Sequence, residues 1–488
     1  MAITYLKRIL QMVILGFGLF YLFSLLWLFS KRLVYPYELD WIEGGMLTSV
    51  IHILDGNNLY TAPSIHYVPF VYAPIFFYFS AIVAKILGAS LLTLRLVSAV
   101  ASLVSLGTIV LIVWGETKSW FWGLASAGLF AGLYPATRFW FDLARVDSVF
   151  LMFFLLFLWS IRRGSNLRWQ VLAGIFLTLT ILTKQNGMTM CLPILAVYCL
   201  FEWRKRMVLP GIFVLLYTIL TLIFVFSSNG WYVYYCFTLA FSKPNDWQVY
   251  PFLDFIHNFL ASNIPIALVL SLSLFPLWFS RAAQERFILW LVALVGTIAT
   301  SYLAKANLGG VNNVVMPTFA ILSILCGIAA HELVLRLHNS RYHALAEIGI
   351  CLLIVLQLGQ LAYNPFSNLP SSDAYKNGVK ALKWIKKFDG NVYLPNSPIA
   401  LMAGKETFAH PSAVWDVFSS GRDSLAKDIL ADELNHAVES KLFDAIVVLP
   451  AYNYFPGIEK NYEIDKTPYI LVDTVWYEKA SVYILKKP

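Results

Sequence analysis

Long apolar segments recur along most of this 488-residue sequence, and they constrain the fold more than any other feature. A helix that crosses the roughly 30 Å hydrocarbon core of a bilayer needs about 20 mostly apolar residues. Eleven segments approach this length: 9–29, 95–114, 119–135, 148–161, 169–183, 187–201, 208–228, 260–279, 287–303, 314–335 and 344–362. With 59% hydrophobic and only 13% charged residues, the chain is predicted to be an all-α polytopic membrane protein with about eleven spans.

The apolar pattern ends near Ala362, and a more polar tail follows. Residues 363–488 contain 14 Lys and Arg residues and 15 Asp and Glu residues. We therefore predict two domains, a transmembrane domain over 1–362 and a small soluble α/β domain over 363–488. Within the tail, the sequence predicts helices over 374–388 and 424–443, a buried strand over 444–450, and two strands within 469–487.

The basic residues of the first 362 positions predict the orientation, because cytoplasmic loops carry an excess of Lys and Arg. If the apolar stretch 68–88 does not span, the main basic clusters share one side with Lys7 and Arg8. These clusters are Arg162, Arg163 and Arg168; Arg204, Lys205 and Arg206; Arg281 and Arg286; and Arg336 and Arg341. If 68–88 spans, every cluster moves to the opposite side. We therefore predict that 68–88 is an in-plane or re-entrant helix, with the N-terminus in the cytoplasm and the C-terminal domain outside.

Three carboxylates follow the first apolar helix in the segment YPYELDWIEGG, residues 35–45. Glu38, Asp40 and Glu43 lie within six positions, before a segment whose apolar residues recur at helical spacing and which is predicted to lie flat on the outer leaflet. Acids at a helix start complement its dipole and need no other role. Three of them exceed what a cap requires, so a catalytic or metal-binding role is the alternative that we favour.

A second polar group lies in RFWFDLARVD, residues 138–147, just ahead of the span at 148–161. It contains Arg138, Asp142, Arg145 and Asp147. These residues are candidates for substrate binding, and Asp147 for catalysis. An ordinary set of ion pairs at the membrane interface is equally compatible with the pattern. A carboxylate at the start of a span requires a partner.

A third polar group interrupts apolar sequence in ILTKQNG, residues 181–187. A cation such as Lys184, beside Gln185, favours an anionic ligand such as a lipid phosphate, although a lysine that snorkels to the interface gives the same pattern. Lys305, in YLAKANLGG, is a further candidate for substrate binding. No nucleotide-binding glycine loop is visible, and the net charge of +8 arises in the membrane part, so neither a soluble nucleotide nor nucleic acid is expected as a partner.

Several motifs occur in a fixed order over roughly the first 200 residues. A first span is followed by Glu38 and Asp40, and then by LDGNNLY, PFVYAPIFFYFSAIVAKILG, LRLVSAVASL, ARVDSVFLMFF and LTKQNG. This order resembles the GT-C superfamily of integral-membrane glycosyltransferases, in particular the branch of protein O-mannosyltransferases and lipid A aminoarabinose transferases. The resemblance implies a many-helix fold in the bilayer, a location in the bacterial inner membrane, and a polyprenyl-phosphate-linked sugar as donor.

The resemblance also implies roles for individual residues. The family's first-loop acid corresponds to Asp40, with Glu38 and Glu43 as neighbours, and its second-loop acid corresponds to Asp147. Asp40 and Asp147 would hold a divalent metal such as Mg²⁺ or Mn²⁺, if one is used. The sequence departs from the family pattern in two places: Leu39 separates the two first-loop acids, and the lysine that precedes the paired prolines is replaced by Val71 and Tyr72. The missing lysine leaves Lys184 as the substitute for a phosphate contact, and Tyr72 is a further candidate for substrate binding.

The expected reaction is an inverting displacement at the anomeric carbon, with a carboxylate as the base and a cation or metal beside the departing phosphate. The acceptor would be a hydroxyl of a glycan, lipid or protein outside the cytoplasm. The main alternative is a transporter or flippase for a lipid-linked glycan, which should bury ionisable residues in mid-span. A non-catalytic assembly subunit is a second alternative.

Overall fold

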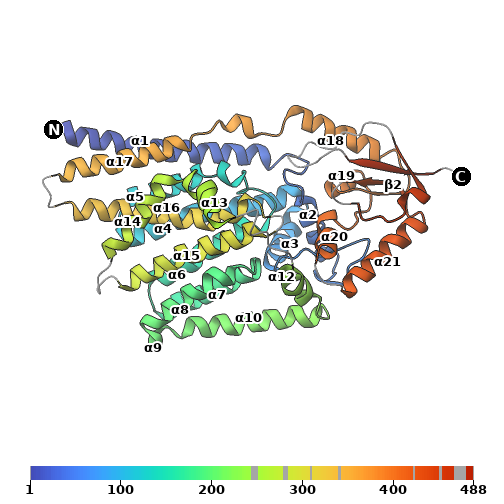
Figure 1. The fold of residues 1–488 in the computed structure, drawn as a ribbon, viewed down its shortest axis with the longest axis horizontal. Helices are drawn as coiled ribbons and strands as arrows, with labels where there is room; N and C mark the ends of the chain where they lie inside the picture. The colour runs from blue at the N-terminus through green and yellow to red at the C-terminus, as the bar shows by residue number, and fades with distance from the viewer. Residues whose placement is uncertain are drawn as a thin grey trace.

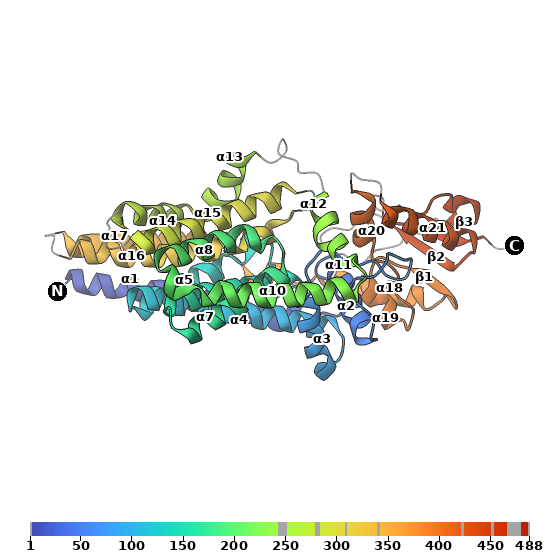
Figure 2. The same ribbon diagram turned by 90° about the horizontal axis from the view of Figure 1, so that it is seen from below.

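The computed structural model describes residues 2–242, 251–278, 284–307, 310–338, 342–420, 424–449, 453–465 and 480–486. Within these ranges, helices form one long bundle, and a small sheet with its own helices lies at one end. The N-terminus and the C-terminus lie at opposite ends of the long axis, as Figures 1 and 2 show. The predicted fold class, an all-α membrane protein with a small α/β part near the C-terminus, is confirmed.

The bundle contains every segment that the sequence predicts to span. Its helices are α1 (Ala2–Arg32), α4 (Leu91–Thr117), α5 (Trp120–Gly132), α6 (Val146–Arg163), α7 (Leu167–Thr183), α8 (Gly187–Phe201), α10 (Val208–Ser227), α14 (Pro265–Trp278), α15 (Gln284–Ala306), α16 (Met316–Arg336) and α17 (His343–Gln360). In the described part of the chain, six helices are long and apolar enough to cross a membrane, and a pair bent by 105° could form a seventh. The number of spans therefore stays a prediction.

Ion pairs gather several of the predicted basic clusters at the bundle end that holds the N-terminus. Arg162 and Arg286 both bind Glu116, at 2.5 and 2.7 Å. Lys7 binds Glu347 at 2.7 Å. These contacts join α1, α4, α6, α15 and α17 at one level, so these bases share one side of the bundle. Which side of the membrane this is remains a prediction.

The other end of the bundle, here called the site end, carries short helices that do not run along the bundle. They include α2 (Glu43–Leu54) and α3 (Ile75–Leu87), which pack against each other. The 13 residues of α3 span only about 20 Å at 1.5 Å per residue, less than the hydrocarbon core. Figure 2 shows α3 projecting from the side of the site end. The non-spanning reading of 68–88 is compatible with this length.

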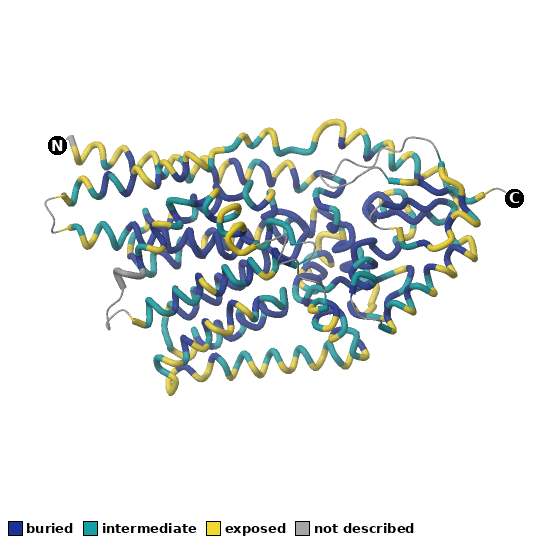
Figure 3. Tube along the Cα trace, in the orientation of Figure 1, coloured by how far each residue is buried: buried dark blue, intermediate teal, exposed yellow. Residues whose placement is uncertain are grey.

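The predicted helix after the acids is present, and none of its residues is exposed. Its position flat on the outer leaflet stays a prediction. The helix begins at Glu43 and includes both glycines, and its first turns are buried. Helix α3, on one side, and the C-terminal residues, on another, cover it. Figure 3 shows buried residues concentrated at this junction, whereas α10 is largely uncovered along its length.

Small elements connect the larger ones. Among the described residues they are α9 (Trp203–Arg206), α11 (Trp231–Val233), α12 (Ala240–Ser242), α13 (Phe252–Phe255), two π-helices (Tyr234–Leu239 and Ile256–Ala261) and four 3₁₀ turns (Pro135–Thr137, Asn312–Val315, Pro365–Asn368 and Ile458–Lys460). The two π-helices lie in the connections after α10 and before α14. Such segments are frequent at functional sites.

The described residues of the C-terminal region, within 363–486, include four strands. Its elements are α18 (Ser372–Ile385), β1 (Asn391–Tyr393), α19 (Ser397–Met402), α20 (Pro411–Phe418), α21 (Leu425–Glu439), β2 (Phe443–Val448), β3 (Tyr462–Ile464) and β4 (Ser481–Leu485). The strand order is β1-β2-β4-β3, with β1 parallel to β2 and the other pairs antiparallel. Of the two strands predicted within 469–487, the second is β4, and the first lies outside the described residues.

The core of the C-terminal region includes residues from the loop after α1. Tyr35 and Tyr37 pack with Ile385 and Ile399 in one buried cluster. The ring of Tyr37 also lies where a Cβ at Gly378 would be, at 2.2 Å, so α18 can approach this loop only because position 378 is a glycine. The predicted division into two domains at 362 therefore stays a prediction, since the two parts share a core.

Candidate active site

The acid loop, residues 33–42, runs from α1 to α2 and is held by one buried arginine. Arg95 of α4 donates from Nε and Nη2 to Glu43, at 2.9 and 2.6 Å. It also donates to the backbone carbonyls of Arg32, Tyr35 and Tyr37, at 3.1, 2.6 and 2.6 Å. One guanidinium thus fixes the path of the whole loop. A bidentate arginine–carboxylate pair gives this geometry its specificity.

Glu43 is fully occupied by this arrangement. Besides Arg95, it accepts from the backbone N–H groups of Leu39 at 2.7 Å and Ala144 at 2.8 Å. Burial acts to raise the pKa of Glu43, but Arg95 outweighs it, and the pKa lies below its ordinary value. Glu43 is therefore an ionised residue whose two oxygens both accept hydrogen bonds. The contact with substrate predicted for it stays a prediction.

Asp40 faces the start of α6 and retains one free oxygen. Its Oδ1 accepts from Arg145 Nη1 at 2.5 Å and from the Ile42 N–H at 3.3 Å. Its Oδ2 is buried and has no partner among the described residues. Burial raises the pKa of Asp40 above its ordinary value, although Arg145 opposes this shift. A partly desolvated carboxylate with one open oxygen has the form of a general base.

Arg145 connects Asp40 to two aromatic residues. Its Nη2 donates to the Tyr72 hydroxyl at 2.9 Å, and its guanidinium lies over the rings of Trp140 and Tyr72, at 5.1 and 5.8 Å from their centroids. Its Nε is buried without a partner within the described ranges. The predicted residues Asp40, Tyr72 and Arg145 therefore form one connected group. Two atoms of this group have no hydrogen-bond partner among the described residues, the acceptor Asp40 Oδ2 and the donor Arg145 Nε.

Asp147 lies on the other side of Trp140. Its Oδ1 accepts from Lys184 Nζ at 2.7 Å, and its Oδ2 accepts from Trp140 Nε1 at 2.9 Å. The charge of Asp147, in the first turn of α6, is thus balanced by Lys184, the residue that follows α7. Trp140, which touches both Arg145 and Asp147, joins the two predicted carboxylates into one site.

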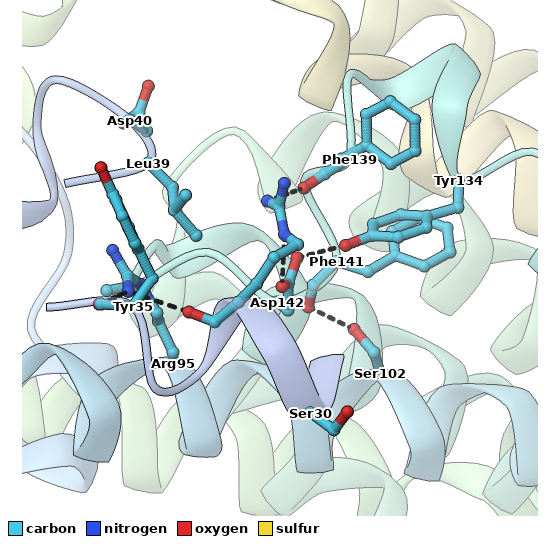
Figure 4. Close-up of polar contacts among 12 residues, drawn as sticks. Ser30, Tyr35, Leu39, Asp40, Arg95, Ser102, Tyr134, Phe139, Phe141 and Asp142 are labelled. Carbon is cyan, nitrogen blue, oxygen red and sulfur yellow. Dashed lines mark hydrogen bonds and ion pairs between the residues drawn. The ribbon is translucent and has the colours of Figure 1, made fainter. Parts of the chain in front are cut away.

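Asp142 belongs to a separate buried group. It accepts from Arg32 at the end of α1 at 2.7 Å and from the hydroxyl of Tyr134. Arg32 also donates to the Phe139 carbonyl at 2.9 Å. Figure 4 shows Asp142 facing Tyr134, with Asp40 apart from it beyond Leu39. Both oxygens of Asp142 are used, so its geometry fits a structural role that joins α1 to the 138–145 segment.

Glu38 lies buried beneath the start of α2. Its Oε1 accepts from the Gly44 N–H at 2.8 Å, whereas Oε2 is buried with no partner in the described part of the chain. Burial, followed by the charge of Glu43, raises the pKa of Glu38 well above its ordinary value. A Cβ at Gly44 would lie 2.2 Å from Glu38 Oε1. The glycine therefore lets the carboxyl reach the backbone.

The remaining predicted residues lie around this group. Gln185 donates to the carbonyls of Val71 and Cys236, at 2.6 and 3.1 Å, which joins the 68–74 segment to a π-helix. Lys305 is buried at the end of α15 and donates to the Gly310 carbonyl at 2.8 Å. Arg138 is exposed and has a left-handed backbone conformation with φ of 55°.

Three of the residues that hold the carboxylates were not predicted as site residues. Arg95, Arg32 and Trp140 each provide a bond that fixes an acid, from positions within or beside predicted spans. An arginine inside the apolar run LLTLRLV was the available signal, because such a residue must find a partner. No comparable signal marks His410 of the C-terminal region, whose Nε2 lies 2.9 Å from the Trp41 carbonyl.

The predicted metal ligands can be tested against their surroundings. Asp40 and Asp147 are each bound to a cationic side chain, Arg145 and Lys184. In the described ranges, no three His, Cys, Asp or Glu side chains lie close enough together to hold an ion. This donor set does not fit a dedicated Mg²⁺ or Mn²⁺ site. The divalent metal expected from the resemblance stays a prediction.

Sequence comparison gives one family match. Residues 71–232 match the profile of the family described as dolichyl-phosphate-mannose-protein mannosyltransferase. This range contains Tyr72, Arg145, Asp147 and Lys184. Among curated protein sequences, none matched this chain significantly.

Solved structures with a similar fold cover nearly the whole chain. ArnT from Cupriavidus metallidurans bound to undecaprenyl phosphate has a TM-score of 0.60 and 12% sequence identity, over 96% of this chain and 98% of that chain. AglB from Archaeoglobus fulgidus, in complex with an inhibitory peptide and a dolichol-phosphate, has a TM-score of 0.50 and 14% identity, over 88% and 69%. The A. fulgidus oligosaccharyltransferase complex with Zn and sulfate has a TM-score of 0.54 and 13% identity, over 88% and 67%.

At these identities the structural likeness shows the fold. ArnT and AglB are GT-C glycosyltransferases, and the family match falls on the segment that carries most of the candidate residues. The resemblance to the GT-C superfamily predicted from the sequence is therefore confirmed.

Proposed function

We propose that this chain, an integral-membrane protein with the GT-C fold, transfers a sugar from a polyprenyl-phosphate donor to a hydroxyl of an acceptor. The acceptor would be a glycan, a lipid or a protein, and the transferred sugar a hexose or a pentose. The printed descriptions of ArnT with undecaprenyl phosphate and of AglB with a dolichol-phosphate support a lipid phosphate as the donor class.

One observation carries the proposal. Arg145 donates to Asp40 Oδ1, whereas the buried Asp40 Oδ2 has no hydrogen-bond partner among the described residues. A carboxylate that removes a proton from a hydroxyl must present a free oxygen to it. Asp40 Oδ2 meets this requirement. Glu38 also has an open oxygen, but burial and the neighbouring Glu43 shift its pKa further in the direction that keeps it protonated. We therefore assign the base to Asp40.

We assign the stabilisation of the departing phosphate to Arg145 and Lys184. Both lie beside carboxylates at the site end, and the buried Arg145 Nε needs an acceptor. Fixed donors aimed at developing negative charge are the largest contribution in many enzymes. Tyr72 and Gln185 would then line the same site through the 68–74 segment, and Asp147 would keep Lys184 oriented.

The reaction balances without another reactant. The acceptor oxygen attacks the anomeric carbon from the face opposite the phosphate, and its proton passes to Asp40 Oδ2. A new bond forms between the acceptor oxygen and the anomeric carbon, while the bond from that carbon to the phosphate oxygen breaks. The electron pair leaves with the lipid phosphate beside Arg145 and Lys184. Configuration at the anomeric carbon is inverted.

The orientation that suits this reaction places the site end outside the cytoplasm, in the bacterial inner membrane. The basic clusters at the N-terminal end of the bundle support it, because positive residues favour the cytoplasmic side. Arg138 and Lys305, near the same end as Asp40, would add positive charge around an anionic lipid headgroup.

Transfer and transport can be separated with the purified protein in proteoliposomes. The donors are undecaprenyl-phosphate mannose, glucose and aminoarabinose, each radiolabelled in the sugar, with detergent-solubilised cell-envelope extract as the source of acceptors. We expect one donor to release free undecaprenyl phosphate and to label an acceptor in equal amounts. Movement of labelled donor between leaflets with no release would contradict the proposal and indicate a flippase.

A further inference from the structure

The C-terminal region reaches into the reaction site through one histidine. His410 lies directly before α20, and its Nε2 is 2.9 Å from the backbone carbonyl of Trp41, the residue after Asp40. Its Nδ1 accepts from the Ser412 N–H at 3.2 Å, which caps α20. A carbonyl only accepts, so Nε2 carries the proton and donates it to Trp41. Burial lowers the pKa of His410 to about 4, so the ring stays neutral.

The first turn of α2, beside His410, has no space for side chains at Gly44 and Gly45. A Cβ at Gly45 would lie 2.4 Å from the ring of Phe70 and 3.0 Å from the His410 ring, and a Cβ at Gly44 would lie 2.6 Å from Pro398. The two glycines therefore let the C-terminal region press directly on the first turn of α2. This explains the paired glycines after the acids better than a helix cap does.

Asp40 is thus held from two sides that come from different parts of the chain. Arg145 of the bundle binds its carboxylate at 2.5 Å. His410 of the C-terminal region binds the carbonyl of the peptide group between Trp41 and Ile42. The Trp41 carbonyl belongs to the same peptide group as the Ile42 N–H, which donates to Asp40 Oδ1 at 3.3 Å, so a rotation of this peptide would move the carboxylate and its Oδ2. Because a general base acts only within hydrogen-bond reach of the hydroxyl, a small rotation is enough to reduce the rate.

We propose that His410 is a positioning residue, which orients Asp40 through the Trp41 carbonyl, so that the C-terminal region completes the reaction site. This inference rests on the proposed function. It assigns to the C-terminal region a role in the chemical step in addition to any contact with the acceptor. The side chain itself touches neither the acceptor hydroxyl nor the departing phosphate in this assignment.

Two substitutions separate positioning from helix capping. In His410→Asn, the amide oxygen takes the place of Nδ1 and keeps the α20 cap, but the short side chain no longer reaches Trp41. In His410→Gln, the amide nitrogen reaches the position of Nε2 and can still donate to Trp41. We expect kcat to fall by about tenfold in the Asn variant, the loss that corresponds to one neutral hydrogen bond, with KM for the donor lipid unchanged. The Gln variant should stay within about threefold of wild type.

Hydrogen exchange measures the position of the loop independently of activity. In His410→Asn, amides of residues 38–46 should exchange faster, while amides of α21 and β2 keep their wild-type rates. Full kcat in His410→Asn, or equal losses in both variants, would overturn the positioning role. Glu406→Gln is the matched control, because it removes a different contact of the C-terminal region with the 59–68 segment, the exposed pair with His66.

The test also separates this inference from the proposed function. If Asp40→Asn remains active, the proposed function fails, whatever His410 does. If Asp40→Asn is inactive and His410→Asn has wild-type kcat and exchange rates, only the inference about His410 fails.

Discussion

Arg145 Nη1 and Asp40 Oδ1 meet at 2.5 Å, and this contact leaves Asp40 Oδ2 buried and open within the described residues. The pair joins the acid loop to the residue that precedes α6. The carboxylate is therefore held directly by Arg145 of the bundle. The Trp41–Ile42 peptide group, whose N–H also donates to Asp40 Oδ1, is held by His410 of the C-terminal region. Rigid support of this kind is what a reactive group needs.

The buried carboxyl of Glu38 should make the protein less stable as the pH rises. Its pKa is raised well above its ordinary value, by burial first and then by Glu43. The folded state therefore binds this proton more tightly than the unfolded state, and the stability that it contributes is complete below the ordinary pKa and is lost as the pH rises through the folded-state pKa. Glu38→Gln imitates the protonated form. We expect a higher melting temperature than wild type at pH 7.5, with the difference vanishing at about pH 4. An equal difference at both pH values would contradict this account.

Arg95 should be required for folding of the acid loop. Arg95→Lys keeps a charge but cannot bond Glu43 in bidentate form and three carbonyls at once. Loss of one partner of a buried pair costs about 3–5 kcal/mol, so we expect a large fall in melting temperature in detergent. Arg168→Lys, an exposed arginine, is the matched control. A melting temperature equal to wild type in Arg95→Lys would show that the acid loop does not depend on the hydrogen bonds of the Arg95 guanidinium.

Lys184 should matter for the chemical step more than for stability. Lys184→Met removes a cation assigned to the departing phosphate, and kcat should fall by about a hundredfold. Lys184→Met also leaves the Asp147 carboxylate without its cation, which lowers stability. The double variant Lys184→Met with Asp147→Asn removes this unpaired carboxylate, so stability should recover while kcat does not. Lys85→Met, at an exposed lysine, is the control. If kcat recovers together with stability in the double variant, the pair is purely structural.

Chelation tests whether protein cations or a metal provide the positive charge. Arg145 and Lys184 occupy the carboxylates that would otherwise bind Mg²⁺ or Mn²⁺. We expect dialysis against EDTA to change the transfer rate by less than about threefold, since the assigned donors are part of the chain. A loss that either metal restores would show instead that Asp40 and Asp147 bind an ion during the reaction.

The sequence predicted the large features because they depend on local patterns. Apolar runs of near-spanning length coincide with the bundle helices, and the buried strand over 444–450 coincides with β2. Strands β1 and β3 have three residues each, which is too short for an alternating pattern to be recognised. The part of the cover over α2 that comes from the C-terminal region was missed because those residues are more than 300 positions away.

The candidate site could be predicted in part. Asp40, Arg145 and Tyr72 were recognised as polar or aromatic residues near the ends of apolar runs, and the structure joins them. Which carboxylate keeps an oxygen without a hydrogen-bond partner could not be predicted, because this depends on partners that are distant in sequence. Glu43 and Asp142 have the same chemistry as Asp40. Arg95 and Arg32 occupy them, and only the fold reveals this.

The most direct test of the central claim is the rate of sugar transfer by Asp40→Asn. The variant keeps the size of the side chain and removes the base, so transfer should fall by about 10²- to 10⁴-fold, with wild-type melting temperature and donor binding. Asp55→Asn, an exposed acid at the end of α2, should have wild-type activity. Transfer by Asp40→Asn at a rate close to that of Asp55→Asn would contradict the account.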